Sequence, residues 1–95
     1  MNRNRRARIA DLSERMKLVE QALAEVQTAI DSITRDEQAS FDAMPEGLME
    51  SPNGRASYAA ILDLDNARAH AESASYRVRD VIEALDYART TDEHV

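Results

Sequence analysis

The chain of 95 residues contains no cysteine and no tryptophan, and it has only two prolines, two glycines, three tyrosines and one phenylalanine. The lack of cysteine excludes disulfides, thiolate metal sites and thiol nucleophiles, and it is typical of an intracellular protein. No apolar run approaches the roughly 18 to 20 residues of a membrane-spanning helix. Because Asp11 and Glu14 interrupt the segment after the basic start, no secretory signal is expected. These absences predict a cytoplasmic protein with no membrane segment.

The sequence also offers little for catalysis or metal binding. His70 and His94 are its only histidines, and they form no pair at helical spacing. We expect His70 to be partly buried beside a helix seam and His94 to lie in a fraying tail. Di-metal carboxylate bundles need Glu-x-x-His pairs, which the chain lacks, and its glycines are too isolated for a phosphate loop. We therefore expect no enzyme activity, no cofactor and no metal.

The strongest positive signal is a seven-residue apolar repeat. Its members alternate at spacings of three and four: Ile9, Leu12, Met16, Val19, Leu23, Val26, Ile30 and Ile33. Such a repeat is typical of a long helix that packs lengthwise on other helices. Neither glycine nor proline occurs before Pro45, so a first helix is predicted over about residues 9–44. Both prolines and both glycines lie in residues 45–54, which predicts the connection.

A second helix is predicted from about Pro52 or Arg55 to about Arg89, and residues 90–95 are expected to fray. Ser51 before Pro52 is typical of an N-cap followed by proline at the first helical position. The same spacing continues in a stripe rich in alanine: Ala60, Leu64, Ala67, Ala71, Ala74, Val78, Val81, Leu85 and Ala88. Large side chains of the first helix would pack on these small ones in an antiparallel hairpin. Leu48 and Met49 are expected to fold back on the hairpin tip.

A hairpin of this length encloses little core, so a single copy would leave apolar surface exposed. Further apolar residues, among them Leu18, Leu62, Tyr76 and Tyr87, lie outside the two predicted stripes. The predicted fold class is all-α: a long antiparallel two-helix coiled-coil hairpin that dimerises into a four-helix bundle. A third packing partner of another kind is an alternative way to bury the same surface.

The charges are unevenly distributed. The net charge is −6, yet four arginines lie in the first eight residues: Arg3, Arg5, Arg6 and Arg8. This basic N-terminal arm, residues 1–8, is a candidate contact for nucleic-acid phosphates, although arginines without interleaved aromatic residues are a weak footprint. The same arm could instead neutralise acidic residues at its own end of the hairpin.

The predicted hairpin tip is acidic. Residues 36–65 contain seven acidic residues, and Arg55 is their only base. This surface favours a basic protein partner, or it mimics nucleic-acid phosphates. The candidate partner-binding residues are Asp36, Glu37, Phe41, Asp42, Glu46, Leu48 and Glu50. Alternatively, Arg55 and Tyr58 at the start of the second helix could hold a small anionic ligand, although tip packing explains the same two residues.

The tip sequence also resembles a known group. Residues 36–51 read DEQASFDAMPEGLMES, and Gly54 follows them. This run is similar to the central signature of small uncharacterised helical proteins encoded in bacteria, prophages and plasmids. The chain departs from that pattern at Pro52 and Asn53, where charged residues are more usual, and in its alanine-rich second helix. The resemblance implies a helical hairpin and draws attention to the tip, but it supplies no activity.

Together these features predict a non-enzymatic protein–protein interaction module, of mobile-element origin, that regulates or inhibits another protein through its acidic tip. The expected partners are a second copy and an unidentified basic protein, with no membrane. A bundle that binds or sequesters a small ligand is one alternative. A nucleic-acid role, through the arginine arm or through mimicry, is the other.

Overall fold

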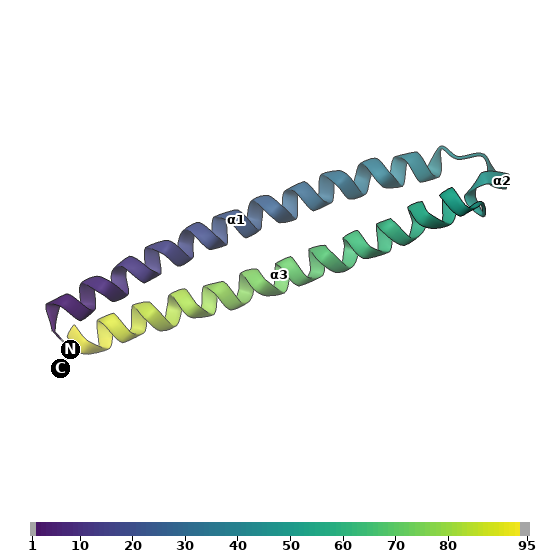
Figure 1. Cartoon of the computed structure of the whole chain (residues 1–95). Helices are drawn as coiled ribbons and strands as arrows, with labels where there is room; N and C mark the ends of the chain where they lie inside the picture. The colour runs from purple at the N-terminus through teal and green to yellow at the C-terminus, as the bar shows by residue number, and fades with distance from the viewer. Residues whose placement is uncertain (1, 94–95) are drawn as a thin grey trace. The chain divides into compact units, whose positions relative to one another are not determined.

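The computed structural model describes residues 2–93, which form three helices: α1 (Arg3–Asp42), α2 (Glu46–Met49) and α3 (Pro52–Glu93) (Figure 1). The prediction of an all-α chain with two long helices is confirmed. The chain divides into two compact units, unit 1 (Met1–Ala24 and Ser73–Val95) and unit 2 (Glu25–Glu72). Each unit contains a stretch of α1 beside a stretch of α3 that runs in the opposite direction.

α1 begins earlier and α3 ends later than predicted, whereas α1 ends at Asp42, just before its predicted end at about residue 44. α1 begins at Arg3, because Asn2 caps it: the Arg5 N–H donates to Asn2 Oδ1 at 2.8 Å. The arginines of the predicted arm therefore lie in the first turns of a helix. α3 continues to Glu93 through most of the predicted frayed tail. His94, for which a place in that tail was predicted, lies outside the described residues.

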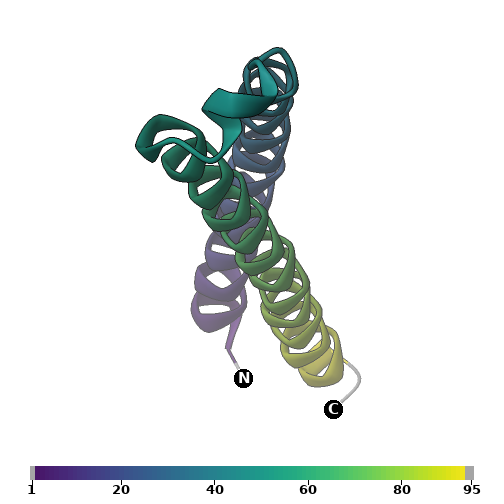
Figure 2. The same cartoon turned by 90° about the vertical axis from the view of Figure 1, so that its right-hand side faces the viewer.

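The connection in unit 2 is short and capped. α1 ends at Asp42, and α2 forms a single turn that begins after Pro45, between the ends of α1 and α3 (Figure 2). The predicted N-cap of α3 is confirmed: Ser51 Oγ accepts a hydrogen bond from the Gly54 N–H at 3.2 Å, and Pro52 is the first helical residue. Proline costs no hydrogen bond at that position.

Gly54 allows α2 to lie directly against the start of α3. A Cβ atom at this position would collide with the backbone carbonyl oxygens of Leu48 and Met49. Gly47 differs, because a Cβ atom there would meet nothing within 4 Å. Of the two glycines in the connection, only Gly54 therefore lies where the backbone of another segment leaves no room for a side chain.

The row of α1 that faces α3 is only half of the predicted seam. Met16, Leu23 and Ile30 are half-buried, as predicted. The other predicted row is exposed, by 43–54% for its members Leu12, Val19, Val26 and Ile33. The row that faces α3 in its place is one residue further along and largely polar, with Ser13, Glu20, Gln27 and Thr34. The prediction was wrong for this row because the two rows lie on opposite sides of Met16, Leu23 and Ile30 on the helix surface. Neighbouring residues lie about 100° apart on a helix, so a seam that contains these three residues can include either row.

The same one-residue difference occurs on α3. Leu64, Ala71, Val78 and Leu85 are half-buried, as predicted, and so are Ala60 and Ala74, whereas Ala67, Val81 and Ala88 are exposed. The second inward-facing row consists of Gly54, Ile61, Arg68, Ser75, Ile82 and Arg89. Ile61, 6% exposed, is the only buried hydrophobic residue in the part of the chain that the structure describes. The two helices therefore enclose a seam that is polar along one side and apolar along the other.

Candidate functional site

The first candidate surface is the exposed apolar row of α1, which we call the outer row: Leu12, Val19, Val26 and Ile33. Leu12 and Val19 belong to unit 1, and Val26 and Ile33 to unit 2. In unit 1, Val81 of α3 is also 43% exposed. Val19 and Val81 each come one residue before an inward-facing position, Glu20 on α1 and Ile82 on α3. On two antiparallel helices such residues lie on the same side of the pair, so Val81 lies on the same side as Val19. Each unit therefore presents apolar side chains along one edge.

The second candidate surface is a cavity at the tip of unit 2. It has a volume of about 330 Å³ and is lined by Phe41, Met49, Glu50, Arg55 and Tyr58. The rings of Phe41 and Tyr58 pack at a centroid distance of 6.0 Å and an angle of 42°. The structure thus brings together two predicted partner-binding residues, Phe41 and Glu50, with both predicted ligand residues, Arg55 and Tyr58.

Leu48 does not fold back on the tip as predicted. Its side chain is 53% exposed, whereas Met49 lies half-buried in the wall of the cavity. The reason is the single turn of α2, which directs consecutive side chains about 100° apart, so that Leu48 and Met49 cannot both face inward. Leu48 is therefore available to a partner.

The predicted acidic residues of the tip divide into two groups. Glu37 is half-buried, and its carboxylate accepts a hydrogen bond from Ser57 Oγ of α3 at 2.5 Å, so it holds the two helices of unit 2 together. Asp42 accepts a hydrogen bond from Gln38 Nε2 at 2.9 Å, but it remains exposed. Asp36, Glu46 and Glu50 are also exposed. We therefore remove Glu37 from the contact surface and keep the other acidic residues.

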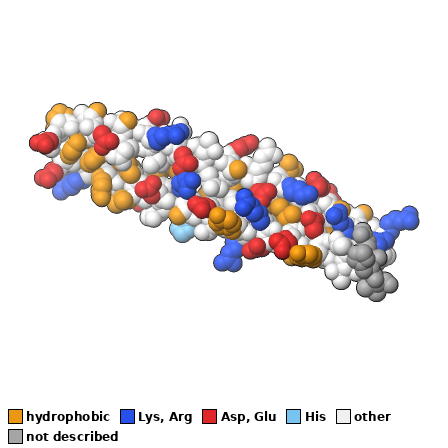
Figure 3. Space-filling view, turned by 180° about the vertical axis from the view of Figure 1, so that it is seen from behind, with side chains coloured by type: hydrophobic (Ala, Val, Ile, Leu, Met, Phe, Trp, Pro, Cys, Tyr) orange, Lys and Arg blue, Asp and Glu red, His pale blue; other side chains and the backbone are white. Residues whose placement is uncertain are grey.

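Charge separates the two units. Unit 2 contains ten acidic and three basic residues, a formal charge of −7, whereas unit 1 contains eight acidic and nine basic residues, a formal charge of +1. Figure 3 shows acidic side chains interspersed with apolar ones around the tip of unit 2. An apolar surface ringed by one sign of charge is typical of a site that selects a partner of the opposite sign.

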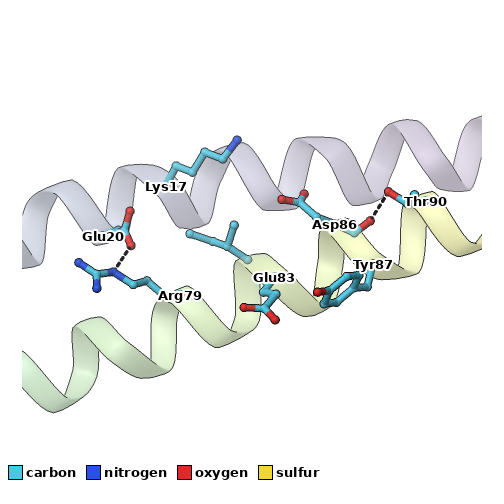
Figure 4. A pocket seen from close by; sticks show the side chains of 8 residues that line it. Lys17, Glu20, Arg79, Glu83, Asp86, Tyr87 and Thr90 are labelled. Atoms are coloured by element: carbon cyan, nitrogen blue, oxygen red, sulfur yellow. Dashed lines mark hydrogen bonds and ion pairs between the residues drawn. The ribbon is translucent and has the colours of Figure 1, made fainter.

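Unit 1 contains a groove of about 480 Å³ between α1 and α3 (Figure 4). Several of its walls' charged side chains are paired within the protein: Arg79 Nε donates to Glu20 Oε2 at 3.0 Å, and its guanidinium lies 5.6 Å from the ring centroid of Tyr76. At the same end, Ser13 Oγ donates to Asp86 Oδ1 at 3.0 Å. These contacts hold the helices in register, so we assign this groove to packing.

Arg68 makes an ion pair between the helices that was not predicted from the sequence. From the inward-facing row of α3 in unit 2, its Nε donates to Asp31 Oδ1 of α1 at 2.6 Å, and its Nη1 donates to Glu72 Oε2 at 3.1 Å. The hydrogen bond and charge of Asp31 raise the pKa of Arg68 above its ordinary value. The spacing of four residues to Glu72 was visible in the sequence, but the approach of Asp31 was not, because it is 37 residues away.

Two further predictions were wrong in position. His70 is exposed, and not partly buried beside the seam. The arginines Arg3, Arg5, Arg6 and Arg8 lie on a helix, so they do not form an extended arm of the kind that follows a nucleic-acid groove. Arg5 and Arg8 line a shallow cavity of about 250 Å³ together with Ile9 and Leu12.

Among residues 2–91, whose side chains the structure describes, no group of three or more histidine, aspartate or glutamate residues could hold a metal ion. Within the same residues, no helix combines the length and the apolar character needed to cross a membrane. No protein-family model, curated protein or solved structure matches the chain. Function is therefore inferred from the surfaces of the two units.

Proposed function

We propose that this chain is a non-enzymatic protein–protein interaction module that associates with a second copy into a four-helix bundle and binds a basic partner at the tip of unit 2. The observation that carries the proposal is the exposure of its apolar side chains. Among the described residues, one hydrophobic side chain is buried, whereas eleven large ones are at least 43% exposed. Exposed apolar surface on this scale marks an interaction site in soluble proteins.

The chemistry of the tip supports a basic protein partner. Leu48 and Tyr58 are more than half exposed, and the carboxylates of Asp42, Glu46 and Glu50 are exposed in the same turn region. Apolar and aromatic anchors supply most of the affinity of an interface, whereas the surrounding charges select the partner and accelerate the encounter. A partner surface with lysine or arginine around an apolar pocket fits this arrangement.

The resemblance of residues 36–51 to proteins of prophages and plasmids supports a more specific role. A non-enzymatic module acts on a cell by binding another molecule. A regulator or inhibitor of a host or element protein is therefore the role that we propose.

Capture experiments in the native host, or a close relative, test the tip. We expect the wild-type protein to retain a specific partner and both Phe41→Ala and Glu46→Lys to retain at least tenfold less of it, because they remove an anchor and a selecting charge. Glu14→Lys is the matched control: it makes the same charge change at an exposed position of unit 1. Equal capture by all four proteins would contradict the proposal.

A small ligand is the second candidate function, favoured by one observation. Both predicted ligand residues, Arg55 and Tyr58, line the tip cavity of about 330 Å³. That volume lies at the lower end of the range for small-molecule pockets. Native mass spectrometry of gently purified protein would show a discrete added mass that Arg55→Ala removes. Protein that carries no added mass and shows no thermal shift with anionic compounds would contradict this candidate.

A further inference from the structure

The accessible surface of the chain is large for its mass. It amounts to 7026 Å² for 10.7 kDa. Compact single-chain proteins of this mass expose about 5,500 Å², which leaves an excess of about 1,500 Å². Obligate homodimers bury about 1,000 to 2,500 Å² on each copy. The excess area is therefore what a second copy of the chain would cover.

The exposed side of α1 has the pattern of a second helix-packing seam. Two alanines lie between the outer-row residues from Val19 onward. The resulting series has spacings of three, four, three and four: Val19, Ala22, Val26, Ala29 and Ile33. All five side chains are exposed. This spacing places them on one face of the helix, and the alanines allow another helix to approach closely. Leu12 extends the same row toward the start of α1.

Charge decides how two copies would pair along this seam. If like units met, two surfaces of formal charge −7 would lie together, whereas unlike units would bring −7 against +1. At physiological salt, like charges repel each other over a screening length of about 8 Å, so charges on the surfaces of two packed helices still interact. The pairing of unlike units is therefore favoured.

We propose that two copies associate with unit 1 of each on unit 2 of the other, α1 against α1. Leu12 and Val19 of one copy then pack against Val26 and Ile33 of its partner. This inference rests on the self-association in the proposed function, and it is tested separately from the partner bound at the tip.

Disulfide trapping tests the arrangement, because the chain has no cysteine of its own. Single-cysteine proteins are mixed and oxidised. With unlike units paired, Val19→Cys and Val26→Cys form a mixed disulfide, because both lie on α1. With like units paired, the twofold axis would place α1 against α3 of the partner, and Val19→Cys would form its disulfide with Val81→Cys. Predominance of the second product would overturn the proposed arrangement.

Light scattering of the full chain measures the association itself. We expect a dimer that Val26→Asp weakens at least a hundredfold. Leu62→Asp is the control, since Leu62 is 47% exposed but lies on α3, away from the edge that carries Val81, and it should leave the dimer intact. Circular dichroism shows whether each variant keeps its helices. If Val26→Asp unfolds the chain, Ala22→Arg, which adds bulk at an exposed helical position, replaces it.

Two outcomes overturn the inference. One is a monomer at 100-micromolar-order concentration. The other is a dimer that tightens as salt is raised, because screening would relieve repulsion between like units. The tip is tested separately, since Glu46→Lys should lose the basic partner and remain a dimer. A monomeric chain that still captures that partner would contradict the pairing and leave the tip binding standing.

Discussion

The inward-facing row of α3 repeats an isoleucine and an arginine in the two units. In unit 2 it contains Gly54, Ile61 and Arg68, and in unit 1, three heptads later, it contains Ser75, Ile82 and Arg89. Their environments differ. Ile61 is buried but Ile82 is half-buried, and Arg68 has two carboxylate partners whereas Arg89 reaches Asp86 at 3.8 Å. The comparison teaches that residue type along one helix does not fix burial, because burial also depends on the segment packed against it.

The largest expected effect separates the two isoleucines. Ile61→Ala should destabilise the protein by about 3 kcal/mol, because it leaves a cavity at a buried position. Ile82→Ala makes the same change at the equivalent place in unit 1 and should cost about half as much, since Ile82 already contacts solvent. Urea unfolding followed by circular dichroism measures both. Equal losses would mean that the two units are packed alike, against the comparison.

The second effect concerns the glycine of the repeated row. Gly54→Ala should destabilise by about 2 kcal/mol, because the new Cβ meets backbone carbonyls of Leu48 and Met49 that cannot rotate away. Gly47→Ala is the control in the same connection. Its Cβ enters open space, so the change should be neutral or stabilise by up to about 1 kcal/mol. Thermal melts of the two variants should therefore shift in different directions, and a tolerated alanine at 54 would contradict the close approach of α2.

The smallest effect distinguishes the two arginines. Arg68→Ala should destabilise less than Gly54→Ala, since its ion pairs are partly exposed, and Arg89→Ala less still, since its contact is longer. An arginine is already protonated at pH 10 and Asp31 raises the pKa of Arg68 further, so the contribution of its ion pairs persists as the pH rises to 10. High salt should reduce the difference between the variants. A salt-independent loss would show that the aliphatic part of Arg68 carries the effect.

Much of the fold could be predicted because its signals are local. The absence of glycine and proline before Pro45, the cluster of both residue types at 45–54, and the Ser51-Pro52 cap each act within a few residues. The helix ends were less well predicted. The Asn2 cap and the continuation to Glu93 depend on single hydrogen bonds and on packing, which a seven-residue pattern does not report.

The candidate site was predicted in part. Phe41, Glu50, Arg55 and Tyr58 were singled out, and they line one cavity. Glu37 was assigned to a partner but bonds Ser57, and Arg68 was overlooked. Both errors involve contacts between residues at least 20 positions apart in the chain. Such pairs depend on the register of two helices, which neither helix specifies alone.

The sequence by itself determined two long helices, the place of their connection, and the concentration of acidic residues in residues 36–65. These properties follow from backbone propensity and from the order of charges. Only the tertiary structure decided which rows face inward. Two rows one residue apart compete for the space beside Met16, Leu23 and Ile30, and the polar row is held there by partners such as Asp86, 73 residues from Ser13. The apolar row is left outside, where we propose that a second copy covers it.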